Sequence, residues 1–462
     1  MTRPGRLTTS PVSTSASPLD TLDVARSLVE RALKAGADAA DAIVVEGTSV
    51  GASWRMGKLE DVERSEGRDA GLRVLVGRRQ AIVSSTDLSE RSLGPLIERA
   101  VAMAKAAPED PYCGLAPTAD LAASWPELDL ADRAIGLDTD ALAERAAEAE
   151  EAALAVAGVT NSEGASAGWS RSGVALATSG GFAGSYEGTS HSISCSVIAG
   201  EGTGMETDYD YSSRRFFADL EAPAAIGRSA AERAVRRLKP RKMKSQAVPV
   251  VYDPRVSAGL IGHLAGAING AAIARGTSFL KNAMDQRILP AGLDVIDDPL
   301  RPRGLRSKPF DGEGLATAPR MLVEDGYLRS WVLDSTTARQ LGLKSTGNAA
   351  RGTGSPPSPS TTNLYLGAGT VSVKDLIADI KQGLYITQLI GMGVNGITGD
   401  YSRGAAGFWI ENGEIVFPVS EITVAGNLRD MFLHLTPADD LEFRHGTDAP
   451  TLRIEGMMVA GT

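Results

Sequence analysis

The chain has 462 residues, of which 43% are hydrophobic and 23% charged, and this balance excludes fibrous and wholly disordered proteins and allows two or three domains. Its formal net charge of −10 repels a phosphate backbone on average, which argues against a nucleic-acid partner. No stretch approaches eighteen consecutive apolar residues, so we expect no membrane-spanning helix. The two cysteines, Cys113 and Cys195, lie too far apart in sequence for a disulfide framework, which fits a reducing, cytoplasmic location.

The first predicted elements are a tail, a helix and a sheet. Residues 1–18 are rich in Ser, Thr and Pro and lack the apolar core of a secretory signal, so we expect a disordered tail. Apolar residues at helical spacing predict a helix from residue 19 to Gly36. Short runs rich in Val and Ile then predict antiparallel strands at 42–46, 50–56, 71–76 and 80–84.

Helical and alternating patterns continue to about residue 240. Helices are predicted at 88–107, 138–157 and 219–238, and alternation of apolar and polar residues predicts strands within 159–213. This alternation makes Cys195 a small core residue. We therefore expect an N-terminal mixed α/β domain over residues 19–240, with an antiparallel sheet and flanking helices, followed by a basic, solvated connector at 239–244.

The second predicted domain covers residues 245–462. It opens with a buried strand at 249–252 and a helix at 257–281, which carries apolar and small residues at helical spacing. One further helix is predicted at 373–380, among glycine-punctuated short strands at 291–297, 320–322, 327–333, 363–366, 407–410, 415–419 and 451–454. The fold class is therefore α+β, with a β-rich C-terminal domain whose curved sheet surrounds the helix at 257–281.

The second half of the chain resembles a known family. Residues 383–432, GLYITQLIGMGVNGITGDYSRGAAGFWIENGEIVFPVSEITVAGNLRDMF, closely resemble the PmbA/TldE subunit of the TldD/PmbA metalloprotease family. The segments KPFDGEG at 308–314, RQLGLKSTGN at 339–348 and SPSTTNLY at 358–365 are similar to segments of that subunit in the same order. The resemblance covers about residues 20–462.

In the catalytic subunit of the family, TldD, the corresponding helix carries a His-Glu-x-x-x-His motif whose histidines bind zinc. That motif falls on Ala258, Gly259 and His263 of this chain. A catalytic zinc needs about three protein ligands and a nearby general base, and neither Ala nor Gly supplies one. The resemblance therefore implies a degenerate motif, with no catalytic residue, metal or cofactor in this chain and with zinc in a TldD partner.

The function implied by the resemblance is that of a non-catalytic subunit. Paired with a TldD-type catalytic subunit, it would form a heterodimeric zinc metalloprotease that degrades or matures unfolded peptides. Candidate residues of the peptide cleft are Ser358, Thr362, Asn363 and Tyr365, where a peptide would be held by main-chain hydrogen bonds.

Two other functions stay open at this point. One is an active metallopeptidase with a rebuilt site, in which His263 and His445 are joined by an acidic residue from the set Asp439, Asp440 and Glu442. The other is a homodimeric peptide-binding or regulatory module, since the isolated chain is a candidate homodimer. Asp311 and Glu313 could serve as acid and base, but the neighbouring glycines favour a turn.

Overall fold

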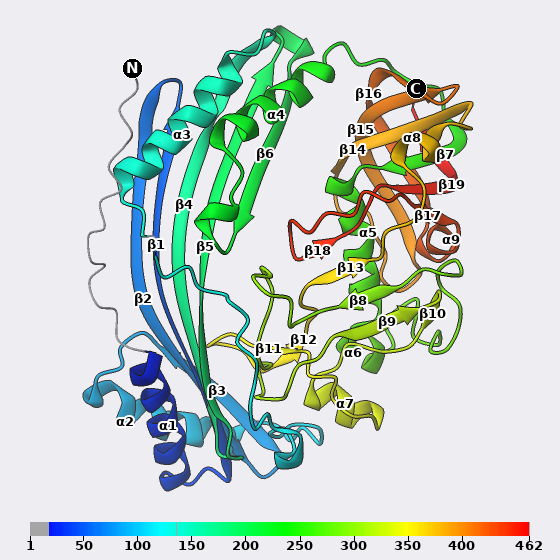
Figure 1. The fold of residues 1–462 in the computed structure, drawn as a ribbon. Coiled ribbons are helices and arrows are strands. Elements are labelled where there is room, and N and C mark those ends of the chain that lie inside the picture. Colours follow the sequence, from blue (N-terminus) through cyan, green and yellow to red (C-terminus); the bar gives the residue numbers. More distant parts are fainter. Residues whose placement is uncertain (1–17, 135, 462) are drawn as a thin grey trace.

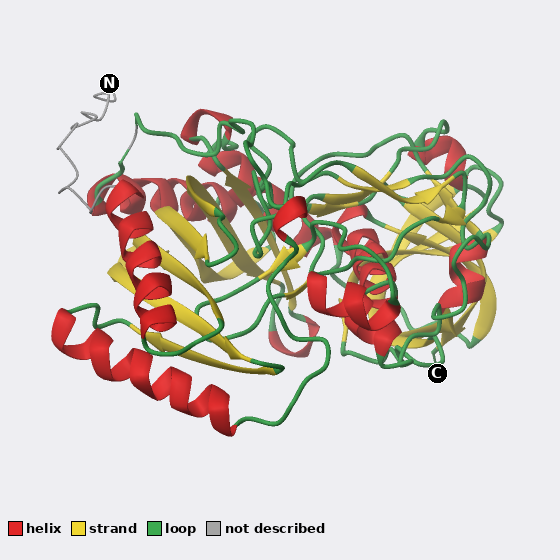
Figure 2. Ribbon diagram, turned by 90° about the horizontal axis from the view of Figure 1, so that it is seen from below, coloured by secondary structure: helices red, strands yellow, loops and turns green. Residues whose placement is uncertain are grey.

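The computed structural model describes residues 18–134 and 136–461 (Figure 1). Apart from Pro18, the predicted tail over residues 1–18 lies outside the described residues. The structure is α+β, as predicted. Its two halves face each other, with a long sheet in the first half and a barrel-like sheet in the second (Figures 1 and 2).

The first half is built on a six-stranded antiparallel sheet in the order β3-β2-β1-β4-β5-β6. The strands are β1 (Ala39–Arg55), β2 (Lys58–Val76), β3 (Arg79–Ser85), β4 (Val159–Thr178), β5 (Ala183–Ala199) and β6 (Glu206–Arg214). The helices are α1 (Pro18–Lys34), α2 (Glu90–Ala106), α3 (Thr139–Leu154) and α4 (Pro223–Arg236), and single 3₁₀ turns lie at Thr118–Asp120, Gly202–Gly204 and Phe217–Asp219.

All four helices cover the same face of this sheet. Side chains alternate along a strand, so β1 residues of the same parity point to the same face. On β1, Ala42 and Val44 pack against α1 and α2, and Val50 and Ala52, at the same parity, pack against α3 and α4. The odd-numbered β1 residues point to the opposite face. Ile43 belongs there to a cluster that contains Phe310 of the second half. The uncovered face of the sheet is therefore turned toward the second half of the chain.

Strands β1 and β2 are longer than the sequence pattern predicts. The strands predicted at 42–46 and 50–56 form one strand, whose Gly47 lies opposite Gly67 of β2. Residues 58–69 were not predicted as a strand, because this charged, exposed stretch has no apolar alternation. It is held by backbone pairing with β1, a contact that leaves no hydrophobic pattern in the sequence.

The second half contains a six-stranded sheet in the order β16-β15-β14-β7-β19-β17, and β16 also pairs with β19, which closes the sheet on itself. Its strands are β7 (Gln246–Tyr252), β14 (Gln382–Ile390), β15 (Asp400–Glu411), β16 (Glu414–Asn427), β17 (Leu435–Pro437) and β19 (Leu452–Ala460). A smaller sheet has the order β10-β9-β8-β13-β18. It comprises β8 (Val295–Asp297), β9 (Arg320–Glu324), β10 (Tyr327–Leu328), β13 (Leu364–Leu366) and β18 (Thr447–Asp448), and β11 (Ala349–Ala350) pairs separately with β12 (Ser358–Pro359).

The helices of the second half are α5 (Pro254–Ala267), α6 (Gly270–Ala274), α7 (Ser335–Leu341), α8 (Val373–Ile377) and α9 (Leu428–Leu433). The prediction of one helix over 257–281 was wrong. The helix is interrupted at Asn269, whose side chain accepts a hydrogen bond from the backbone N–H of Ala271 and so caps α6. Among the described residues, none of the helices is both long and apolar enough to cross a bilayer.

A buried ion cluster joins the two halves. Asp41 of β1 accepts hydrogen bonds from Arg73 of β2 and from Arg351, which follows β11 in the second half. The three side chains are at most 2% exposed. Burial alone would raise the pKa of Asp41, but the guanidinium groups of Arg351 and Arg73 outweigh it and hold that pKa below its usual value. The carboxylate is therefore charged at neutral pH and pairs with both arginines.

Candidate functional site

Helix α5 places the degenerate motif beside the closed sheet. Pro254 stands at its first position, and the Asp253 side chain caps it by accepting from the N–H of Arg255. Its inner face buries Leu260, Ile261 and Leu264 among the strands of the closed sheet. The stripe predicted from the sequence is thus a packing face, and it fixes where the other side of α5 points.

That other side of α5 carries little side-chain bulk. Gly259, Gly262 and Gly266 are exposed, and a Cβ atom added at any of them would meet nothing within 4 Å. Glycine inside a helix is destabilising relative to alanine by roughly 0.5–1 kcal/mol. The glycines therefore leave the outer surface of the helix open at a cost in stability.

We expect Gly262→Ala to raise the free energy of unfolding by about 0.5–1 kcal/mol, because the added methyl group restricts the unfolded chain and clashes with nothing. Urea denaturation followed by circular dichroism measures this change. Gly227→Ala is the control, and we expect it to lower the free energy of unfolding, since its Cβ would lie 1.9 Å from the carbonyl oxygen of Ala149. Equal shifts in the two variants would contradict the expectation.

The motif positions do not form a metal site. Ala258 is half-buried, Gly259 is exposed, and His263 is half-buried with its ring centroid 6.1 Å from that of Tyr401. Burial, together with the nearby Arg403, lowers the pKa of His263, so its imidazole is neutral at pH 7. A neutral imidazole can ligate zinc, but one ligand does not hold a catalytic ion, so these residues do not fit the group.

Two of the residues considered for a rebuilt site, His445 and Asp440, are engaged elsewhere. His445 Nδ1 lies 2.8 Å from the Tyr211 hydroxyl of β6, in a contact between the two halves. Asp440 accepts from the N–H and the hydroxyl of Thr451. Over residues 18–134 and 136–461, no group of three His, Cys, Asp or Glu side chains is arranged to hold a metal.

The candidate cleft residues divide into two kinds. Thr362 is buried and donates to Asp297, while Asn363 is buried and hydrogen-bonds to Asp298, Ser307 and the backbone of Arg306. Ser358 is exposed on β12 and Tyr365 is half-buried on β13. A peptide could reach only the latter two directly, and a role of the four residues in peptide binding stays a prediction.

Asp311 and Glu313 form a buried carboxylate pair near the ion cluster. Asp311 accepts from the N–H groups of Glu313, Leu315 and Ala349, and Gly314 has the positive φ of +85° that the predicted turn requires. One oxygen of Glu313 accepts from the N–H of Ser335, whereas the other is buried and has no hydrogen bond to any residue that the structure describes. Burial, reinforced by the Asp311 charge, raises the pKa of Glu313 to about 7.

This shift predicts a loss of stability on going from acid to neutral pH. A carboxyl group whose pKa rises from 4.5 to about 7 on folding stabilises the fold fully below pH 4.5, and the contribution disappears as pH rises through 7. We expect Glu313→Gln to remove about 1–3 kcal/mol of this pH dependence, measured as urea midpoints between pH 5 and 8. Glu324→Gln, at an exposed position of β9, is the control; the same pH profile in both variants would contradict the assignment.

The basic end of α4 has acidic partners that sequence reasoning missed. Arg237 donates to Glu206 at 2.9 Å and approaches Asp208 at 3.5 Å, and Arg233 lies 3.5 Å from Asp210. The signal was present, because acidic residues alternate along one face of β6 and the two arginines are spaced one helical turn apart. From the sequence, the basic run at 239–244 is predicted to be only a connector.

Comparison with known proteins identifies the family. Profiles described as PmbA/TldA metallopeptidase domain 1, central domain and C-terminal domain match residues 40–104, 132–238 and 245–461. The chain belongs to the PmbA/TldD metallopeptidase family. The resemblance noted in the sequence is thereby confirmed.

Two curated relatives match the chain over nearly its whole length. Metalloprotease PmbA of Escherichia coli O157:H7 is 39% identical over 92% of each chain, and the Metalloprotease PmbA homolog of Haemophilus influenzae is 38% identical over 94% of each. A crystal structure from Bacteroides thetaiotaomicron has a TM-score of 0.88 at 28% identity, covering 95% of this chain and 98% of that one. TldE from Thermococcus kodakarensis has a TM-score of 0.85 at 21% identity over 95% and 100%, which shows a shared fold.

Proposed function

We propose that this member of the PmbA/TldD family is a non-catalytic subunit of a heterodimeric zinc metalloprotease. The observation that carries the proposal is the makeup of α5, where Ala258 and Gly259 stand at positions that would need a ligand and a base. Its relatives are named metalloproteases, and a metalloprotease needs a metal. The ligands would then come from a TldD-type partner.

The chain's own contribution would be to complete the wall of a chamber and to restrict entry to unfolded peptides. The glycine-lined outer surface of α5 supports this role, since it keeps space free next to Ala258 and His263, the positions at which the catalytic helix would carry its histidines. The proposal includes the division into domains at 19–240 and 245–462. Separate hydrophobic clusters in the two halves support that division.

The experiment compares the purified chain alone and mixed with a TldD-type chain, in the presence of zinc and an unfolded peptide. We expect cleavage only in the mixture, and we expect size-exclusion chromatography with metal analysis to place zinc in the peak that contains both chains. Zinc bound stoichiometrically to this chain alone would overturn the proposal. Cleavage by this chain alone that is lost in His263→Ala, but kept in the exposed-histidine control His434→Ala, would overturn it too. A stable homodimer that ignores the partner would favour a regulatory module instead.

A further inference from the structure

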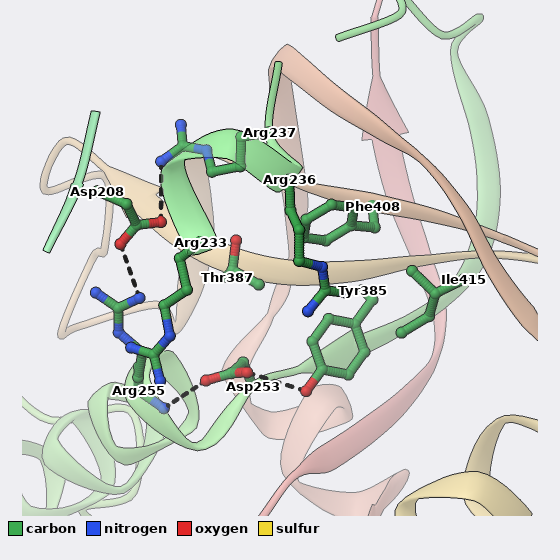
Figure 3. A pocket seen from close by; sticks show the side chains of 10 residues that line it. All are labelled: Asp208, Arg233, Arg236, Arg237, Asp253, Arg255, Tyr385, Thr387, Phe408 and Ile415. Carbon is green, nitrogen blue, oxygen red and sulfur yellow. Dashed lines mark hydrogen bonds and ion pairs between the residues drawn. The ribbon is translucent and has the colours of Figure 1, made fainter. Parts of the chain in front are cut away.

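A small cavity lies where the two halves of the chain meet. It has a volume of about 150 Å³ and is lined by the end of α4 and by β6 from the first half, and by the β7–α5 junction and strands β14, β15 and β16 from the second (Figure 3). A water molecule takes about 30 Å³ in the liquid, so the space corresponds to roughly five waters. This is room for one small polar group.

Four arginines line the cavity, and three of them have acidic partners. Arg237 and Arg255 pair with Asp208 from opposite sides, and Arg233 pairs with Asp210. Arg236 is exposed and stacks on Phe408, with its guanidinium carbon 5.0 Å from the ring centroid. In the described part of the chain no acidic side chain pairs with Arg236. Its guanidinium N–H groups are therefore free to donate.

Within residues 18–134 and 136–461, two further polar atoms at the cavity lack hydrogen-bond partners. The hydroxyl of Thr387, on β14 between Arg233 and Tyr385 in Figure 3, is buried and makes no hydrogen bond. Nη1 of Arg233 is also buried without one, since its contact with Asp210 at 3.5 Å is an ion pair and not a hydrogen bond. Buried polar atoms in native proteins are almost always hydrogen-bonded, so two such donors at one cavity point to a group that supplies an acceptor.

The acidic residues at the cavity do not fill this need. Asp253 accepts from the Tyr385 hydroxyl at 3.0 Å and from the N–H of Arg255 at 3.0 Å. Asp208 is held between two arginines. Both carboxylates are thus engaged with donors of the protein, and the donors of Arg236, Arg233 and Thr387 remain.

The charges at the cavity argue against a multiply charged acceptor. The four arginines are balanced by Asp208, Asp253 and, behind them, Asp210 and Glu206. A doubly charged phosphate would leave a net charge of −2 at this partly buried place, whereas a carboxylate leaves −1 and matches the two-pronged geometry of a guanidinium group. We propose that the cavity binds a single carboxylate group of a peptide substrate.

This inference rests on the proposed function, since it assumes that unfolded peptides reach the chamber. The carboxylate could come from the peptide's C-terminus or from an acidic side chain. Both sources present the same two oxygens to Arg236 and to the Thr387 hydroxyl. The binding experiment therefore uses peptides that separate them.

The probe is an unstructured peptide without acidic residues, labelled at its N-terminus with an uncharged BODIPY dye that has no free carboxylate, and prepared with a free or an amidated C-terminus. A third, amidated form carries one internal glutamate. Fluorescence anisotropy with the complex of this chain and a TldD-type partner, its metal removed to prevent cleavage, measures the Kd of each. We expect the free-acid peptide to bind at least tenfold more tightly than the amide. Tight binding of the glutamate peptide instead would assign the site to side chains.

Two variants test the site itself. Arg236→Gln and Thr387→Val should each reduce the preference for the carboxylate peptide at least fivefold, whereas Arg228→Gln, an exposed arginine of α4 that does not line the cavity, should leave it unchanged. Equal affinity for all three peptides, or equal effects of the three variants, would overturn the inference. So would inorganic phosphate displacing the peptide better than acetate at equal ionic strength. Cleavage of the amidated peptide by the zinc-loaded complex tests the proposed function separately, because it does not require a terminal carboxylate.

Discussion

Asp41→Asn is expected to lower the free energy of unfolding by about 3–5 kcal/mol, because it removes the carboxylate that pairs with Arg73 and Arg351 while both arginines stay buried. The amide keeps the shape of the carboxylate but accepts through one oxygen only and carries no charge. Since Arg351 belongs to the second half, the first sign of the loss should be separation of that segment from the sheet. Urea denaturation and trypsin cleavage after Arg351, whose side chain is fully buried in the folded protein, measure both effects.

The control for Asp41→Asn is Glu109→Gln. Glu109 pairs with Arg79 at the surface, where 65% and 41% of the two side chains are exposed, so its loss should cost less than about 1 kcal/mol. Adding Arg351→Met to Asp41→Asn removes one of the stranded charges. We expect this double variant to be more stable than Asp41→Asn alone. Similar losses for Asp41→Asn and Glu109→Gln would show that the cluster does not hold the halves together.

Gly71→Val is the second large effect that we expect. A Cβ at Gly71 of β2 would lie 2.1 Å from the carbonyl oxygen and 2.6 Å from the Cα of Thr353, so a side chain there would push two backbones apart. Overpacking of this kind costs about 1–3 kcal/mol, and here the displaced atoms are backbone that no rotamer change can move. We expect a loss of about 3 kcal/mol in urea denaturation and faster trypsin cleavage after Arg351.

The same strand offers a matched position. Gly67 of β2 has nothing within 4 Å of its added Cβ, and Gly67→Val should change the stability by less than about 0.5 kcal/mol. If both variants unfolded at the same urea concentration, the contact between β2 and the segment after β11 would have no role in stability.

The sequence predicted those parts of the fold whose signal is local. The apolar periodicity of α2 and the alternation of β5 are properties of neighbouring residues. The helix predicted at 88–107 lies within two residues of the bounds of α2, and β5 lies inside the region 159–213 in which alternating strands were predicted. The charged part of β2 was missed, because its partner β1 supplies backbone hydrogen bonds and almost no burial. The break at Asn269 was missed because a capping side chain in the middle of a small-residue run resembles a continuing helix.

The candidate site also has one part that the sequence predicts and one part that it does not. That Ala258 cannot serve as a ligand and Gly259 cannot serve as a base follows from residue type alone. The arginine-lined cavity could not be predicted from the sequence, because it forms where α4 meets elements that come much later in the chain, such as β14. Asp41 and Arg351 are 310 residues apart, and no spacing rule connects an aspartate on a strand with an arginine on a distant loop.

The closed sheet of the second half also sets an order of events during synthesis. β7 opens that half but has β19, the final strand, as a neighbour, with Tyr252 opposite Leu452. A ribosome must therefore release about 200 further residues before β7 gains this neighbour, while the sheet of the first half already has all its strands. A nascent chain that ends just before β19 would have a complete sheet in its first half, but the sheet of its second half would still be open. Premature termination there should therefore yield a species that aggregates through exposed strand edges.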